Sequence, residues 1–135
     1  MFHVDHYAIS VKDADKSIEF YSKLNFSLVK DWRAEDGSVR IVHMTNDSFI
    51  LEMFCYPDSA ALPEFVKDLN TDLKVKGAKH LGLWVEDLEK SADYLQQVGI
   101  VDVKPEISQG RLGRPYFFIK DPDGIFVEII SAKES

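Results

Sequence analysis

The stretch HYAISVKDADKSIEFYSKLNFSLV, residues 6–29, returns in altered form as HLGLWVEDLEKSADYLQQVGIVDV, residues 80–103. Both copies open with a histidine and carry an aspartate just before a run with helical spacing of apolar residues. Further along the chain, NDSFILEMF (46–54) matches PDGIFVEII (122–130). An internal repeat of this length predicts two similar structural modules. We assign residues 1–55 to the first module, 56–77 to a linker and 78–135 to the second, within a single domain.

Each module is predicted to contain a strand, a helix and three further strands. Asp13 and Asp87 are expected to cap the N-termini of the two helices, because an aspartate side chain can accept a hydrogen bond from a free backbone N–H there. The linker contains a short helical stretch around 63–69, and residues 107–115 form a glycine-containing loop. The predicted strands are 3–11, 26–32, 38–45 and 48–55 in the first module and 79–85, 100–106, 115–120 and 125–132 in the second. The fold class is therefore α+β, with the order βαβββ present twice.

The overall composition restricts the classes of partner. The chain has 135 residues and a formal net charge of −7, which disfavours nucleic acid and anionic membranes. No segment approaches the roughly 20 apolar residues of a membrane span, and we expect a cytoplasmic protein. The single cysteine, Cys55, excludes an internal disulfide and a cysteine-based zinc site. Its place in an apolar run predicts a buried, inert thiol.

Alternation along the strands predicts which side chains share a face of each sheet. Tyr7, Ile9 and Val11 form a bulky row suited to packing under the helix, so His6 points to the opposite face. The same alternation recurs in the second module. The residues expected on the two faces away from the helices are His6, Glu52, His80 and Glu128.

Two imidazoles and two carboxylates suit a divalent cation, which would also offset the cost of burying the glutamates. A histidine at a strand end is commonly a surface or core residue, and a glutamate within a strand can face solvent. Recurrence of both at equivalent positions of the repeat favours the metal site. His3 and His43 have no partner in the repeat and are expected to be structural.

These motifs resemble the vicinal oxygen chelate superfamily, which includes glyoxalase I, methylmalonyl-CoA epimerase, extradiol dioxygenases and fosfomycin-resistance enzymes. The resemblance rests on residues 6–29, on HLGLWVEDLEK (80–90) and on FFIKDPDGIFVEII (117–130), and it extends over nearly the whole chain. It implies a cupped, half-barrel-like mixed sheet around a metal site, and a homodimer. The sequence departs from the family pattern after the first helix, where Leu24-Asn25 replaces the usual Leu-Gly.

The resemblance also implies a ligand set and a type of reaction. The family's ligands fall on His6, Glu52, His80 and Glu128, and Glu52 favours glyoxalase I over the epimerases, which commonly have glutamine there. The implied reaction is proton abstraction next to a carbonyl, with a divalent metal stabilising the enediolate. Glu128 would be the base, and Glu52 would return the proton. The metal is one of Zn²⁺, Ni²⁺, Co²⁺, Mn²⁺ or Fe²⁺.

The substrate is expected to be a small molecule whose identity stays open, since the arginine and asparagine that hold glutathione in glyoxalase I have no clear counterpart. Arg111 and Arg114 could clamp a carboxylate or phosphate, or could simply be solvated loop residues. Two alternatives remain: an epimerase-like or thiol transferase enzyme of the same fold, or a small-molecule-binding resistance protein. The aromatic residues expected near the substrate, or alternatively in the core, are Phe54, Trp84, Tyr116, Phe118 and Phe126.

Overall fold

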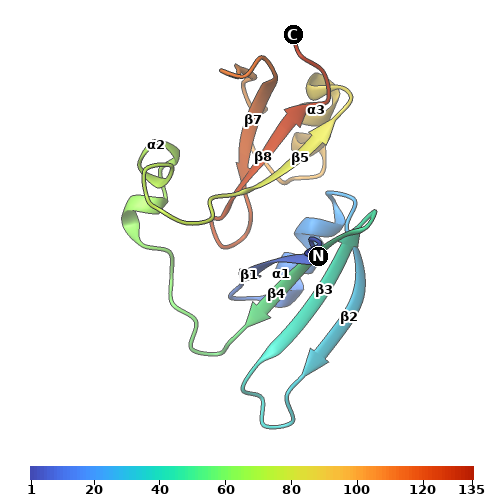
Figure 1. Cartoon of the computed structure of the whole chain (residues 1–135), viewed down its shortest axis with the longest axis vertical. Coiled ribbons are helices and arrows are strands. Elements are labelled where there is room, and N and C mark those ends of the chain that lie inside the picture. Colours follow the sequence, from blue (N-terminus) through green and yellow to red (C-terminus); the bar gives the residue numbers. More distant parts are fainter. The chain divides into compact units, whose positions relative to one another are not determined.

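The computed structural model describes all residues, 1–135, and the chain forms two compact units, Met1–Ala61 and Leu62–Ser135 (Figure 1). Each unit contains a four-stranded mixed sheet with a helix connecting its first two strands. The α+β class predicted from the repeat is confirmed. Residues 56–61 of the predicted linker belong to the first unit and residues 62–77 to the second.

In the first unit the strand order is β1-β4-β3-β2. Strands β1 and β4 are parallel, whereas the β2–β3 and β3–β4 pairs are antiparallel. The central strands β4 and β3 bury Leu51, Met53, Val42 and Met44 completely, on the face that the helix covers. The elements are β1 (His6–Ser10), α1 (Ala14–Ser22), β2 (Ser27–Arg33), β3 (Arg40–Asn46) and β4 (Phe49–Cys55).

The second unit repeats this topology, with strand order β5-β8-β7-β6 and a parallel β5–β8 pair. The short helical stretch predicted in the linker is present as a 3₁₀ turn followed by one turn of α-helix. The elements are η1 (Glu64–Val66), α2 (Leu69–Asp72), β5 (Leu81–Val85), α3 (Leu88–Gln97), β6 (Ser108–Gln109), β7 (Pro115–Lys120) and β8 (Phe126–Ser131).

The predicted helix caps are both present. Asp13 accepts a hydrogen bond from the backbone N–H of Lys16 at 3.2 Å, and Asp87 accepts one from Lys90 at 3.0 Å. On the inner face of α1, Ser17 is fully buried, whereas Ile18 is only half-buried.

The strand predicted for residues 100–106 is wrong, because the only strand between α3 and β7 is the two-residue β6. Three local features explain the difference. Pro105 lacks the N–H that a sheet ladder needs. The Lys104 ammonium bonds Glu89 and Asp93 of α3, both at 2.8 Å, and Gln96 Nε2 donates to the backbone carbonyl of Asp102 at 3.0 Å. The segment is thus held against the helix rather than extended beside β7.

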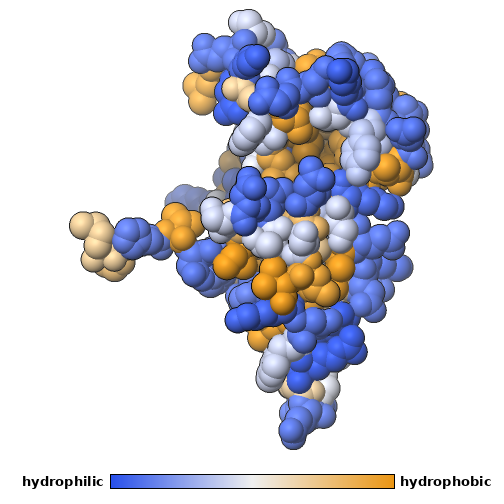
Figure 2. Space-filling view, turned by 90° about the vertical axis from the view of Figure 1, so that its right-hand side faces the viewer, coloured by the Kyte–Doolittle hydropathy of each residue, from blue (hydrophilic) through white to orange (hydrophobic).

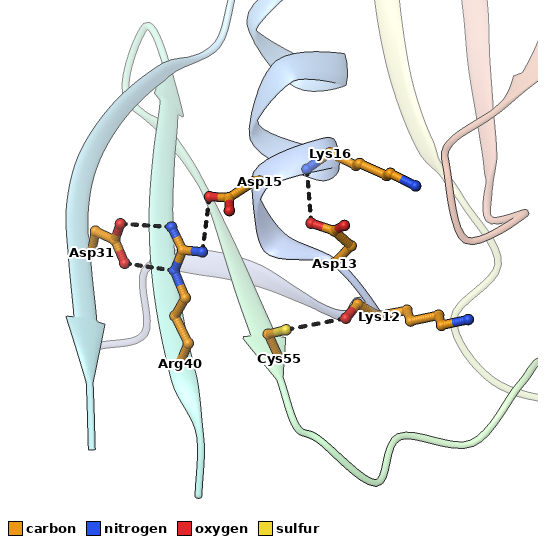
Figure 3. A network of polar contacts seen from close by, with 7 residues as sticks. All are labelled: Lys12, Asp13, Asp15, Lys16, Asp31, Arg40 and Cys55. Atoms are coloured by element: carbon orange, nitrogen blue, oxygen red, sulfur yellow. Dashed lines mark hydrogen bonds and ion pairs between the residues drawn. The ribbon is translucent and has the colours of Figure 1, made fainter. Parts of the chain in front are cut away.

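A network of ion pairs ties helix α1 to its sheet at the end where β3 begins (Figure 3). The Arg40 guanidinium bonds both carboxylate oxygens of Asp31 on β2, at 2.9 and 2.8 Å, and Asp15 on α1 at 2.9 Å. Arg40 lowers the pKa of the Asp31 carboxyl below its ordinary value, chiefly through this hydrogen bond. Beside it, the thiol of Cys55 donates to the backbone carbonyl of Lys12 at 3.4 Å. Cys55 is half-buried, so the expectation of a fully buried thiol is wrong.

The outer strand of the first unit, β2, is exposed along its whole length. Its large apolar side chains are roughly half exposed: Leu28 at 49%, Val29 at 56% and Trp32 at 55%. Figure 2 views the molecule from the side of β2, and hydrophobic residues are visible there among polar ones. None of the helices has the length and apolar character that a membrane crossing needs.

Candidate metal-binding site

In the first unit, strand register brings His6 and Glu52 together on the face away from α1. The parallel pairing of β1 and β4 places His6 beside Ile50 and Ala8 beside Glu52. His6 and Glu52 are therefore diagonal neighbours, with the small Ala8 leaving room between them. Nε2 of His6 lies 3.4 Å from Oε1 of Glu52, whose side chain is only 16% exposed.

The second unit builds the same arrangement with its own residues. Gly82 of β5 pairs with Glu128 of β8, and His80 directly precedes β5. Nε2 of His80 lies 2.9 Å from Oε2 of Glu128, and both side chains are about one-fifth exposed, at 19% and 20%. The same imidazole nitrogen thus faces the glutamate in both units.

The second nitrogen of each histidine has different surroundings. Nδ1 of His6 lies 2.6 Å from the Asp5 carboxylate, and this hydrogen bond raises the pKa of His6. When Nδ1 of the neutral imidazole carries the proton and donates it, Nε2 has an unshared electron pair. This nitrogen faces a carboxylate oxygen of Glu52. Two acceptors 3.4 Å apart suit a shared cation, and metal-bound histidines commonly donate their other N–H to a carboxylate.

His80 has no such orienting carboxylate. Its Nδ1 is buried without a hydrogen-bond partner, and the preceding residue Lys79 bonds Asp72 instead. The ring is held by packing: Phe118 lies edge-on to it, with centroids 4.8 Å apart and planes at 89°.

The spacing within each pair fits coordination to one metal ion. Two ligand atoms about 2.1 Å from a metal at tetrahedral or octahedral angles are about 3.0–3.4 Å apart. The observed separations of 3.4 Å in the first unit and 2.9 Å in the second are close to this range. Each unit supplies one pair of the predicted set, and no group of three or more His, Cys, Asp or Glu side chains is arranged as a metal site.

His43 is a further neighbour of Glu52, one that the repeat does not predict. It was expected to be structural, but it lies directly opposite Glu52 in the β3–β4 register, and its Nε2 lies 2.6 Å from Oε2 of Glu52. The hairpin predicts this contact. When strands 38–45 and 48–55 are paired across their short turn, these two residues lie opposite each other. The equivalent residue in the second unit, opposite Glu128, is Phe118, so a comparison of the two modules for identical residues overlooks His43.

The predicted substrate-contacting aromatic residues lie on the same sheet faces as the glutamates. Phe54 shares the face of Glu52 and stacks on Tyr56, with ring centroids 6.4 Å apart. In the second unit, register places Tyr116 and Trp84 on the face of Glu128. Trp84 is 64% exposed, whereas Phe126 is buried and packs against Phe118.

The two arginines of the glycine-containing loop differ. Nε of Arg114 donates to the backbone carbonyl of Ser131 at 2.7 Å, so this residue fastens the loop to the end of β8. Arg111 is exposed at the tip. Arg111 is therefore the arginine whose guanidinium is presented to solvent.

Comparison with known proteins agrees with this architecture. Residues 3–129 match the Glyoxalase/Bleomycin resistance protein/Dioxygenase superfamily. The uncharacterized protein YwkD of Bacillus subtilis (strain 168) is 31% identical over 128 residues, which cover 93% of this chain and 94% of YwkD. Lactoylglutathione lyase of Schizosaccharomyces pombe is 26% identical over 151 residues; the match covers 99% of this chain but 49% of that protein, so the chain spans about half its length.

Among solved structures, a glyoxalase family protein from Enterococcus faecalis superposes with a TM-score of 0.78 at 24% identity, over 95% of this chain and 96% of that one. This likeness shows the shared fold. The repeated βαβββ units and the family match over nearly the whole chain lead to one conclusion. The chain belongs to the Glyoxalase/Bleomycin resistance protein/Dioxygenase superfamily, as the resemblance to vicinal oxygen chelate proteins predicted.

Proposed function

We propose that this protein is a divalent-metal-dependent lyase or isomerase of the glyoxalase I type, which moves a proton next to a carbonyl group. The observation that carries the proposal is the pairing of a histidine with a glutamate at the same register position of both units. His6, Glu52, His80 and Glu128 are the proposed metal ligands. The bound metal would supply Lewis-acid stabilisation of the negative charge that develops on the substrate oxygens.

Glu128 is the proposed general base. His80, at Oε2, is its sole hydrogen-bond or ion-pair partner, so Oε1 is unengaged and can accept a proton from the substrate carbon. The half-buried position keeps this carboxylate partly shielded from water. Gly82 pairs with Glu128 on the neighbouring strand and places no side chain beside the carboxylate.

Glu52 is the proposed residue that returns a proton to the substrate, after taking one up from water, while Glu128 releases its own proton to water. Both oxygens of Glu52 face imidazoles, Oε1 that of His6 and Oε2 that of His43. Neither oxygen of Glu52 is therefore as free to approach a substrate carbon as Oε1 of Glu128. The difference in partners supports Glu128, rather than Glu52, for the abstraction step.

The exposed face of the second unit is the proposed place of substrate contact. Trp84 and Tyr116 supply aromatic surface, and Arg111 supplies a positive charge that suits a carboxylate or phosphate. Arg114 contributes by holding the loop in place. In the first unit, Phe54 is the proposed apolar contact for substrate.

A second candidate is a small-molecule-binding protein, as the bleomycin resistance members of the superfamily name suggest. The observation that favours it is Trp84, an indole that is 64% exposed on a face with further aromatic rings. Exposed aromatic rings can sequester a planar ligand without any reaction. An epimerase or thiol transferase with the same metal ligands is a third candidate.

We further propose that the protein associates as a homodimer. The exposed edge strand β2 carries three half-exposed apolar side chains, and an unpaired edge of this kind invites pairing with another chain. A second copy would cover it. Sedimentation equilibrium of the wild-type protein measures the association directly.

The test of function is a proton-exchange assay on the metal-loaded protein in D₂O. Hemithioacetals of methylglyoxal with glutathione or with other thiols, and an epimerisable acyl-CoA, would be supplied in turn. We expect deuterium at the carbon next to the carbonyl for one class of substrate, together with loss of exchange on metal removal. Tight binding of a candidate ligand without exchange would instead favour the sequestering protein.

A further inference from the structure

The immediate neighbours of Glu52 come from both adjacent strands. Ala8 of β1 lies on one side of it and His43 of β3 on the other. The pairing with His43 is a direct cross-strand one, so backbone register fixes the distance between the two side chains. The imidazole is half-buried, with 26% of its side chain exposed.

The contacts of Glu52 divide between its two carboxylate oxygens. Oε2 lies 2.6 Å from Nε2 of His43, and Oε1 lies 3.4 Å from Nε2 of His6. The rings of His6 and His43 have centroids 6.4 Å apart and planes 25° apart. The carboxylate is thus held between two roughly parallel imidazoles, and rotation about its last bond would break the shorter contact.

The second unit provides an internal comparison for this contact. Opposite Glu128 stands Phe118, which offers no hydrogen-bond donor and packs edge-on against His80. Two glutamates at equivalent positions therefore differ in the residue opposite them on the neighbouring strand, an imidazole for Glu52 and a phenyl ring for Glu128. One is restrained by an imidazole on β3, and the other is free on the corresponding side.

We propose that His43 is a positioning residue that holds Oε2 of Glu52 and so presents Oε1 alone toward His6. The inference rests on the proposed metal site and adds to it a residue outside the four ligands. Glu52 becomes a one-oxygen ligand in a fixed orientation. Groups that orient metal-binding carboxylates typically contribute 10–100-fold to metal affinity.

The test is a Co²⁺ titration of the full chain, followed by visible absorption and by competition with a chelator. His43→Phe installs the residue that the second unit carries, and His43→Gln keeps a donor that can reach the carboxylate. His43→Val is a second disruptive variant that suits a strand, in case phenylalanine impairs folding. His3→Phe removes an exposed histidine elsewhere and serves as the matched control.

We expect wild type and His3→Phe to bind Co²⁺ alike, and His43→Phe and His43→Val to bind about 10–100-fold more weakly with an altered spectrum. His43→Gln should recover most of the affinity and the wild-type spectrum. In the Glu52→Gln background, His43→Phe should add little further loss, because it acts through Glu52. Equal affinity and identical spectra for wild type, His43→Phe and His43→Val would overturn the role of His43 alone. Failure of wild type to bind Co²⁺ would overturn the proposed metal site, and this inference with it.

Discussion

Glu52 and Glu128 occupy the same register position in two copies of one repeat, and their surroundings differ. Glu52 lies between His6 and His43, whereas Glu128 contacts His80 and has Phe118 on its other side. His6 is oriented by Asp5, and His80 is oriented by the ring of Phe118. The repeat reproduces the backbone and one His–Glu pair, while single substitutions around that pair alter how freely each carboxylate moves.

This difference in partners predicts different chemical roles for Glu52 and Glu128. Glu52, with both oxygens engaged by imidazoles, is the more restrained of the two proposed metal-binding carboxylates. A carboxylate with a free oxygen can accept a proton. Pseudo-symmetric halves can therefore supply two chemically distinct glutamates.

The largest effect is expected from replacing the proposed base. Glu128→Gln should lower the turnover of the substrate found in the proton-exchange assay about 10²–10⁴-fold, the usual contribution of a general base. Glu52→Gln should also lower it, because an amide cannot return the proton although its oxygen can still bind the metal. Steady-state rates of metal-loaded variants measure both. Full turnover by Glu128→Gln with metal retained would show that Glu128 is not the base.

The next largest effect should come from a substitution that gives Glu128 the same opposite residue as Glu52. Phe118→His places an imidazole opposite Glu128, as His43 stands opposite Glu52. We expect about a tenfold loss of turnover, the lower end for changes around a metal-binding group. Co²⁺ binding should persist. Turnover equal to that of wild type would mean that the free oxygen of Glu128 is unimportant.

Much of this arrangement was predictable from the sequence, and the reasons are physical. The recurrence of His6 and Glu52 as His80 and Glu128 identified both pairs, because strand alternation fixes the face of each residue. His43 was missed because its contact depends on register between strands, and the repeat offers only a phenylalanine there. Residues 100–106 were predicted as a strand because the first module has one at the equivalent place, but Pro105 and the Lys104 ion pairs keep this segment out of the sheet.

A smaller effect is expected on the free energy of unfolding, which should depend more on the ion pairs of the first unit than on those of the second. Each unit has a cation that bonds two carboxylates, Arg40 in the first and Lys104 in the second. Arg40 is the less exposed, at 15% against 38% for Lys104. Arg40→Met should lower the free energy of unfolding by about 1 kcal/mol. Lys104→Met, the matched control, should lower it less in urea titrations at pH 7.

The Arg40 contribution should also depend on pH. Because the pKa of Asp31 is below its ordinary value of 3.8 in the folded protein, its stabilising effect is full above that value and is lost as the pH falls further. The difference between wild type and Arg40→Met should therefore shrink from pH 7 to pH 3. A difference that stays constant over this range would argue against the ion pair as its source.

The smallest effect concerns the residue that follows each helix. Asn25 has φ of 67°, and Gly99, its counterpart in the second unit, has φ of 78°. Asparagine tolerates this left-handed conformation better than most residues, which explains how Leu24-Asn25 can stand where the family usually has Leu-Gly. Asn25→Gly should stabilise the protein by roughly 0.5 kcal/mol, and Asn25→Ala should destabilise it by about 1 kcal/mol. Thermal unfolding of both variants measures the difference, and a stabilising Asn25→Ala would contradict the reasoning.

The central proposal is that His6, Glu52, His80 and Glu128 are ligands of one divalent metal ion. Elemental analysis of the purified wild type beside His6→Ala and His80→Ala tests it most directly. We predict about one metal ion per chain in wild type and loss of it in both variants, since each unit contributes half of the ligands. Wild type without stoichiometric metal, or metal retained in both variants, would contradict the account.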